Sequence, residues 1–142
     1  LCPGVPAVVV GAGPSLDDNA PLLATLQDRA VIIAADTALR PLLAAGVRPH
    51  FVAGVDPSEL NARHVGGVSG VDDVWMVAEG SLHPSAFEPF GNRIFTFRVS
   101  QHEPWPWLRE AGVTRGSLRA WGSVVTSAFD LALRLGCDPV VF

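Results

Sequence analysis

Lysine is absent from this chain of 142 residues, whose positive charge is carried entirely by ten arginines. The arginines are scattered along the sequence and are outnumbered by 14 acidic residues, which gives a net charge of −4 and a pI near 5.4. Proteins that bind nucleic acids need a basic face to neutralise phosphates. We therefore expect no nucleic-acid partner, although the composition leaves room for one anionic small molecule.

Cysteine is also scarce, since Cys2 and Cys137 are the only two in the chain. They form no Cys-x-x-Cys pair, and neither has a histidine at metal-ligand spacing. The sequence thus predicts no disulfide framework, no zinc site and no other metal centre, and both residues are interpreted as ordinary thiols.

Long apolar runs are missing too. None reaches the roughly 18 residues of a membrane span, and no charged segment precedes an apolar one as in a secretory signal. We expect a cytoplasmic protein with no membrane partner. The chain starts at Leu1 without a methionine and stops at Phe142 inside an apolar run, so we interpret it as a piece of a longer protein, truncated at both ends.

What the sequence has in abundance is apolar residues, at 49% of the chain, with only 17% charged and a mean hydropathy of +0.32. This composition excludes disorder and predicts a well-filled core. The length suits one domain, residues 1–142, and leaves no room for two independent cores.

Short β-branched runs alternate with helical segments along the whole chain. The runs are continuously apolar, which is typical of strands buried on both faces of a parallel sheet. Strands are expected at 7–10, 31–35, 51–55, 74–78, 94–97 and 139–142, and helices at 14–26, 37–45, 58–65, 84–90, 105–111 and 123–135. This order predicts an α/β fold: a Rossmann-like, doubly wound single domain with a mainly parallel sheet.

The first expected strand runs into the turn GAGPSLDD, residues 11–18, at the start of a helix. Gly11 and Gly13 permit a positive φ and the close approach of a ligand, and Pro14 suits the first helical position. Free amides there favour a phosphate, so the turn is either a phosphate cradle or an ordinary strand-to-helix turn. Leu16 occupies the third glycine position of the dinucleotide fingerprint, which weakens an NAD site.

Two aspartates follow the next two strands. Asp36 comes 23 residues after Gly13, where dinucleotide-binding folds place an acid on a ribose hydroxyl, and Asp56 ends the third strand. Because ligands of open parallel sheets bind beyond the carboxyl ends of the strands, both should line one crevice with the glycine turn. Alternatively, each aspartate simply caps the helix that follows it.

A further contribution is expected from Gly122 and Ser123, which open the apolar helix at 123–135. They would either bind a second polar group of the same ligand or only cap the helix. Trp105 and Trp107 flank a proline, and they would either stack on a sugar or base or pack in a small apolar cluster.

The remaining polar residues carry no prediction of chemistry. The histidines show neither metal spacing nor an ordered serine–histidine–aspartate set, so no catalytic role is assigned to His50, His64, His83 or His102. The pair at 72–73 is interpreted as a solvated turn.

Three motifs occur in order: GAGPSLDDN at 11–19, IIAADTALRPLLAAGVRPHFVAGVDPSELNARH at 32–64, and WGSVVTSAFDLALRLGCDPVVF at 121–142. Together they resemble the MptE-like family, and most closely its bacterial branch, the motility-associated factor (Maf) glycosyltransferases. The resemblance extends over essentially the whole chain and is weakest between residues 66 and 121.

The resemblance implies two enzyme functions. Maf proteins are implicated in transferring nonulosonic, sialic-acid-like sugars from CMP-activated donors to flagellin, and their core resembles bacterial sialyltransferases. The archaeal branch is a 6-hydroxymethyl-dihydropterin diphosphokinase that uses ATP and Mg²⁺. That branch carries a denser acidic motif where this chain has VDPSEL, residues 55–60, so the sequence favours sugar transfer. A non-catalytic nucleotide-binding module is a third alternative.

The resemblance also assigns roles to individual positions. A donor phosphate or ribose would be held by the turn residues Gly11, Gly13, Pro14 and Ser15. The ribose and base would be surrounded by Asp36, Thr37, Asp56 and Pro57, and the pocket would be closed by Gly122 and Ser123. The sialyltransferases have Asn-Pro where this chain has Asp56-Pro57. Their catalytic base would lie beyond Phe142, so the resemblance implies that this fragment binds a nucleotide without turnover.

Overall fold

A computed structural model describes residues 1–99 and 104–142. Within these residues six strands form one sheet in the order β5-β4-β3-β2-β1-β6, and each pair of neighbouring strands is parallel. The strands are β1 (Ala7–Val10), β2 (Val31–Ala35), β3 (Phe51–Gly54), β4 (Trp75–Glu79), β5 (Ile94–Phe97) and β6 (Val140–Val141). The predicted α/β, Rossmann-like parallel sheet is confirmed.

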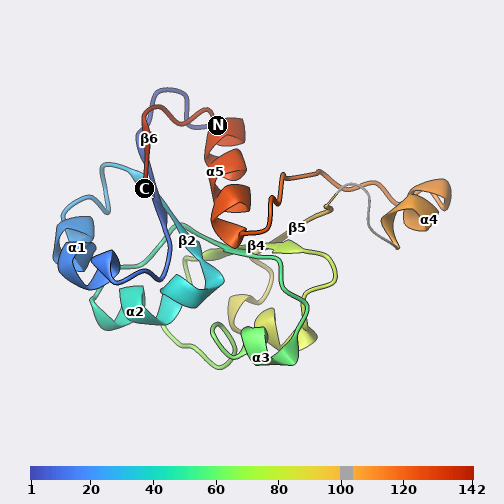
Figure 1. Cartoon of the computed structure of the whole chain (residues 1–142), viewed down its shortest axis with the longest axis horizontal. Helices are drawn as coiled ribbons and strands as arrows, with labels where there is room; N and C mark the ends of the chain where they lie inside the picture. The colour runs from blue at the N-terminus through green and yellow to red at the C-terminus, as the bar shows by residue number, and fades with distance from the viewer. Residues whose placement is uncertain (100–103) are drawn as a thin grey trace.

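Helices cover both faces of the sheet (Figure 1). Helices α1 (Ser15–Ala24) and α2 (Leu39–Ala44) pack with the larger apolar cluster, which includes Ile32 and Met76. Helix α5 (Val124–Leu135) packs on the opposite face over β1, β2 and β3. Because β2 lies between these layers, all five of its residues are buried, which explains its unbroken apolar run.

Helix α5 begins and ends as its sequence predicts. The Ser123 hydroxyl accepts a hydrogen bond from the Val125 amide at 3.3 Å, and Gly136 ends the helix with a φ of +86°. Serine at the N-cap and a left-handed glycine at the end satisfy backbone groups that the helix leaves free. Both predicted caps are confirmed.

The other predicted helices are shorter than their sequence patterns indicate. Helix α3 spans only Glu59–Ala62, and the segment at 84–90 forms two 3₁₀ turns, Pro84–Ala86 and Glu88–Phe90. A proline lies in the first turn of each, and Gly91 ends the second with a φ of +56°. Pro89 lacks the N–H that an α-helix continuing over 84–90 would need at that position. A further 3₁₀ turn, Asp36–Ala38, precedes α2, and α4 spans Trp105–Glu110.

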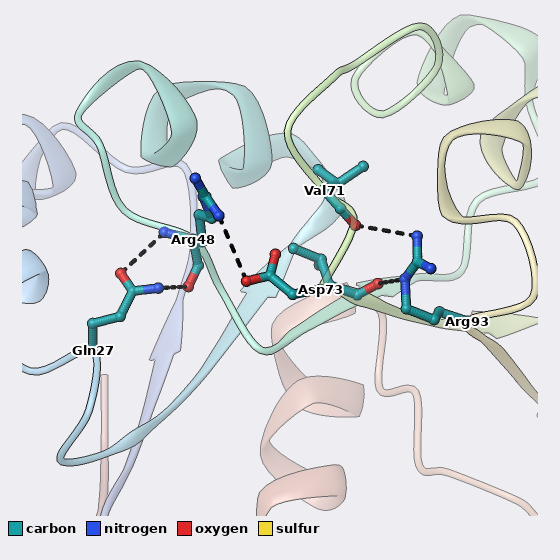
Figure 2. A network of polar contacts seen from close by, with 6 residues as sticks. Gln27, Arg48, Val71, Asp73 and Arg93 are labelled. Atoms are coloured by element: carbon teal, nitrogen blue, oxygen red, sulfur yellow. Dashed lines mark hydrogen bonds and ion pairs between the residues drawn. The ribbon is translucent and has the colours of Figure 1, made fainter.

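Polar contacts tie together the loops at the amino ends of the central strands (Figure 2). The Gln27 amide donates to the Arg48 carbonyl at 2.6 Å and accepts from the Arg48 backbone N–H at 3.1 Å. The Arg48 guanidinium lies 3.7 Å from the Asp73 carboxylate, so the predicted solvated turn at 72–73 carries an exposed ion pair. Arg93 donates to two backbone carbonyls before β4. This edge of the sheet is therefore occupied by structural contacts.

Within residues 1–99 and 104–142, no helix is both long and apolar enough to cross a membrane.

His50 also makes a structural contact at the amino ends of the strands. Its Nδ1 accepts a hydrogen bond from the Ile32 backbone N–H at 3.0 Å, so the contact requires an unprotonated Nδ1. Burial lowers the pKa of His50 below 6.5, although Asp73 and Asp28 oppose this shift. The stabilising contribution is therefore complete above pH 6.5 and is lost as the pH falls through the folded-state pKa.

We expect the free energy of unfolding to fall between pH 7.5 and pH 5.5 in part because His50 becomes protonated. In His50→Asn the side-chain oxygen can accept the same hydrogen bond without titrating, so this part of the slope should disappear. Urea unfolding at a series of pH values measures the effect, with the exposed His64→Asn as the control. An unchanged slope in His50→Asn would contradict the assignment.

Candidate nucleotide-binding site

The carboxyl ends of β2, β3 and β4 open into a cavity of about 570 Å³, which the first turn of α5 also lines. Its volume is within the range typical of small-molecule sites. Six predicted site residues line it together: Asp36, Thr37, Asp56, Pro57, Gly122 and Ser123. Sequence reasoning did not name the other seven lining residues: Val55, Asn61, Glu79, Ser81, Val99, Ala120 and Val124.

The glycine turn lies beside this cavity and does not line it. Gly11 and Ser15 line an adjoining cavity of about 300 Å³ between α1 and β6, while Gly13 and Pro14 line a shallower hollow of about 270 Å³. The structure thus brings the ten predicted residues to three neighbouring hollows. That any of them binds a nucleotide stays a prediction.

The two loop glycines do not use the positive φ that their residue type permits. A Cβ at Gly11 would lie 3.3 Å from Val125 Cγ2, so the glycine allows β1 to approach the first turn of α5 closely. Pro14 was expected as the first helical residue, but it is the N-cap of α1, one position earlier than the helix itself begins, and it makes no side-chain capping bond. The turn therefore contributes packing whether or not it also binds a ligand.

Asp36 is buried at the end of β2, where it is 4% exposed. Its Oδ1 accepts from the Thr37 amide at 2.8 Å, and its Oδ2 accepts from Asn61 Nδ2 at 2.6 Å. Burial raises the pKa of Asp36, and these two hydrogen bonds partly oppose the shift. Asn61 reaches Asp36 from α3, so the third helix fixes the orientation of this carboxylate.

Asp56 is exposed and does not cap the following helix as the alternative interpretation expected, because the N-cap of α3 is Ser58 and Asp56 stabilises the turn before it. Its Oδ1 accepts from the Ser58 amide at 2.9 Å, and the Ser58 hydroxyl in turn caps α3 through the Asn61 amide at 3.2 Å. The other carboxylate oxygen of Asp56 takes no part in this turn, and Asp56 is one of the residues that line the cavity. The turn contact of Asp56 is therefore compatible with a ligand role for the same carboxylate.

Glu79 is a third carboxylate at the carboxyl ends of the strands, and the sequence analysis did not identify it. It ends β4 and is 6% exposed. Its Oε1 accepts from Trp105 Nε1 at 2.6 Å, while its Oε2 accepts from the backbone N–H and hydroxyl of Ser81. The rule that singled out Asp36 and Asp56, an acid directly after a buried strand, would also have found Glu79.

The two tryptophans about Pro106 have different environments. Trp105 is 8% exposed and its indole N–H donates to Glu79, whereas Trp107 is 64% exposed on α4, so the two do not share a small apolar cluster. Of the histidines, His83 contacts Ser85 and caps the 3₁₀ turn that follows it. His102 lies outside the described residues.

Polar residues of α5 bind the backbone of the segment that precedes this helix and forms one wall of the cavity. Ser127 Oγ donates to the Arg119 carbonyl at 3.0 Å, and Asp130 Oδ2 accepts from the Arg119 backbone N–H at 3.1 Å. Arg134, one helical turn along, pairs with Asp130 at 2.9 Å. Both backbone groups of Arg119 are thus bound, which fixes the segment that ends in Gly122, whose φ is +77°.

The lining of the cavity is acidic. Three carboxylates contribute to it, and among the described residues no basic side chain does. No group of three or more histidine, cysteine or acidic side chains in the described ranges has the geometry of a metal site. The amino end of α5, at Gly122 and Ser123, is a part of the lining where a helix dipole favours a negative group.

Comparison with known proteins agrees with this architecture. A solved structure described as a "MAf glycosyltransferase from Magnetospirillum magneticum AMB-1" matches with a TM-score of 0.79 and 25% identity, over 97% of this chain. The match spans only 22% of that larger chain. No curated protein matches. The family model described as "6-hydroxymethylpterin diphosphokinase MptE-like" matches residues 2–142, and the chain belongs to this MptE-like family.

Proposed function

We propose that this domain is the nucleotide-binding core of a Maf-type glycosyltransferase, which uses a CMP-activated nonulosonic sugar as its donor. The observation that carries the proposal is the cavity at the carboxyl ends of β2–β4, closed by the amino end of α5. In open parallel sheets this is where nucleotides bind. The similarity to a Maf glycosyltransferase supports sugar transfer, and flagellin would be the acceptor of the full-length protein.

The roles follow from charge and position. The ribose would be bound by Asp36, which can accept hydrogen bonds from hydroxyl groups. The single phosphate of CMP would lie at Gly122 and Ser123, where backbone amides and the helix dipole stabilise the charge that develops on the leaving group. With three carboxylates in the lining, a ligand carrying one phosphate is favoured over a triphosphate without a cation.

The alternative is a diphosphokinase that uses ATP and Mg²⁺, which the description of the matching family favours. Carboxylates are the protein ligands that Mg²⁺ prefers, and a triphosphate would bring the ion with it. Among the described residues, however, no group of three or more acidic, histidine or cysteine side chains is placed to hold a metal ion, which supports the CMP-sugar proposal over the alternative.

Calorimetric titration with CMP, and with ATP in the presence and absence of Mg²⁺, separates these functions. We expect CMP to bind with an affinity that is indifferent to Mg²⁺, because helix amides hold its phosphate. ATP binding that requires Mg²⁺ would favour the diphosphokinase. Binding of CMP without acceptor-dependent turnover in the full-length protein would instead indicate a non-catalytic nucleotide module.

Asp56→Ala should weaken CMP binding and cost about 1 kcal/mol of stability, because it removes a cavity-lining acceptor and a turn hydrogen bond. Ser58→Ala is the matched control, since it removes the cap of α3 but no cavity-lining side chain. It should cost similar stability and leave CMP affinity within about twofold. Calorimetry and urea unfolding give both quantities, and equal affinity losses in the two variants would assign Asp56 to the turn alone.

Gly13→Val combined with Ser15→Ala tests whether the ligand extends from the large cavity to the glycine turn. If the turn holds the donor's phosphate or ribose, this double variant should abolish CMP binding, while Asp72→Ala on the opposite edge should leave it unchanged. Retained binding in the double variant would restrict the site to the cavity at β2–β4.

A further inference from the structure

The carboxylate of Glu79 is held in one orientation at the wall of the large cavity. It has three hydrogen-bond donors: Trp105 Nε1 at 2.6 Å on Oε1, and the backbone N–H at 2.7 Å and hydroxyl of Ser81 on Oε2. A carboxylate has about four acceptor positions on its two oxygens. Oε1 therefore keeps acceptor capacity, in a residue that lines the cavity.

Trp105 is seated for this contact by Gly80. A Cβ at Gly80 would lie 2.6 Å from Trp105 Cζ2 and 2.8 Å from Cη2, so only glycine lets the indole approach the end of β4 this closely. The indole is 8% exposed and comes from α4, far from Glu79 in the sequence. A buried tryptophan whose N–H reaches a carboxylate fixes that carboxylate's rotamer.

The position of Glu79 in the sheet suits one part of a nucleotide. It ends β4, two strands from β2, at whose end Asp36 lies. Neighbouring strands are about 4.8 Å apart, so the ends of β2 and β4, which carry the two carboxylates, are separated by about 10 Å across the sheet. That distance is comparable to the length of a pyrimidine nucleoside between its ribose hydroxyls and its far base edge.

We propose that Glu79 determines which nucleobase the cavity accepts, by taking a hydrogen bond from an exocyclic amino group, and that Trp105 is its positioning residue. The inference rests on the proposed function, in which Asp36 binds the ribose and α5 the phosphate. Cytosine has an amino group at its far edge, which a carboxylate accepts well. Uracil has a carbonyl oxygen there, which would face the carboxylate oxygen with no hydrogen between them.

The first test is the ratio of CMP to UMP affinity in the unaltered chain, measured by calorimetry. We expect CMP to bind roughly tenfold or more tightly, as for other hydrogen bonds that discriminate bases. Equal affinities would overturn the role of Glu79 and leave the proposed function standing. If neither nucleotide binds, both the proposed function and this inference fail.

Two variants test the residues themselves. Trp105→Phe leaves the Glu79 carboxylate in place but removes the indole N–H that fixes its orientation. CMP affinity should therefore fall several-fold while UMP affinity stays the same. A merely structural role would lower both equally. Glu79→Gln combined with Trp105→Phe adds an amide N–H that can donate to uracil, with no indole donor opposing it. Its CMP-to-UMP ratio should fall to about one or below.

Trp107→Phe, an exposed substitution on the same helix, is the control and should leave both affinities unchanged. Thermal unfolding of each variant establishes that it is folded. A CMP-to-UMP ratio in the double variant equal to that of the unaltered chain would overturn the proposal. If the double variant fails to fold, the ratio of CMP to UMP affinity in the unaltered chain still decides whether the proposal holds.

Discussion

The parallel pairing of the strands is the constraint on which the rest of this structure depends. Parallel neighbours must be joined by crossovers, which place helices on both faces and bury the sheet from two sides. The carboxyl ends of all the strands then lie on the same side of the sheet, so residues far apart in the sequence come together there. Asp36, Asp56 and Glu79 are neighbours because each follows or ends a strand of this set.

The chain changes direction in the sheet between β5 and β6, and α5 makes that crossing on the face opposite α1 and α2. The first turn of α5 therefore faces the carboxyl ends of the strands. Its buried polar residues, Ser127 and Asp130, bind the backbone of Arg119 and fix the segment before the helix. One helix thus covers a sheet face, orients a cavity wall and supplies the positive end of a dipole.

The acidic lining and the helix end divide the cavity into two electrostatic parts. Carboxylates at the ends of β2, β3 and β4 accept hydrogen bonds and suit hydroxyl and amino groups. The amino end of α5 suits an anion. A nucleotide has the same polarity, with a neutral nucleoside at one end and a phosphate at the other, so the ligand we propose is compatible with a domain of net charge −4.

Local patterns in the sequence determined the strands, the caps of α5 and the carboxylates Asp36 and Asp56, because strand burial and helix capping depend on neighbouring residues. Helix lengths at 58–65 and 84–90 were overestimated, since prolines and tertiary packing decide where a short helix stops. Only the tertiary structure decided that Asn61 binds Asp36, that Trp105 fixes Glu79, and that the glycine turn lies beside the main cavity. These contacts join distant segments, and their geometry is set by crossovers that no local pattern encodes.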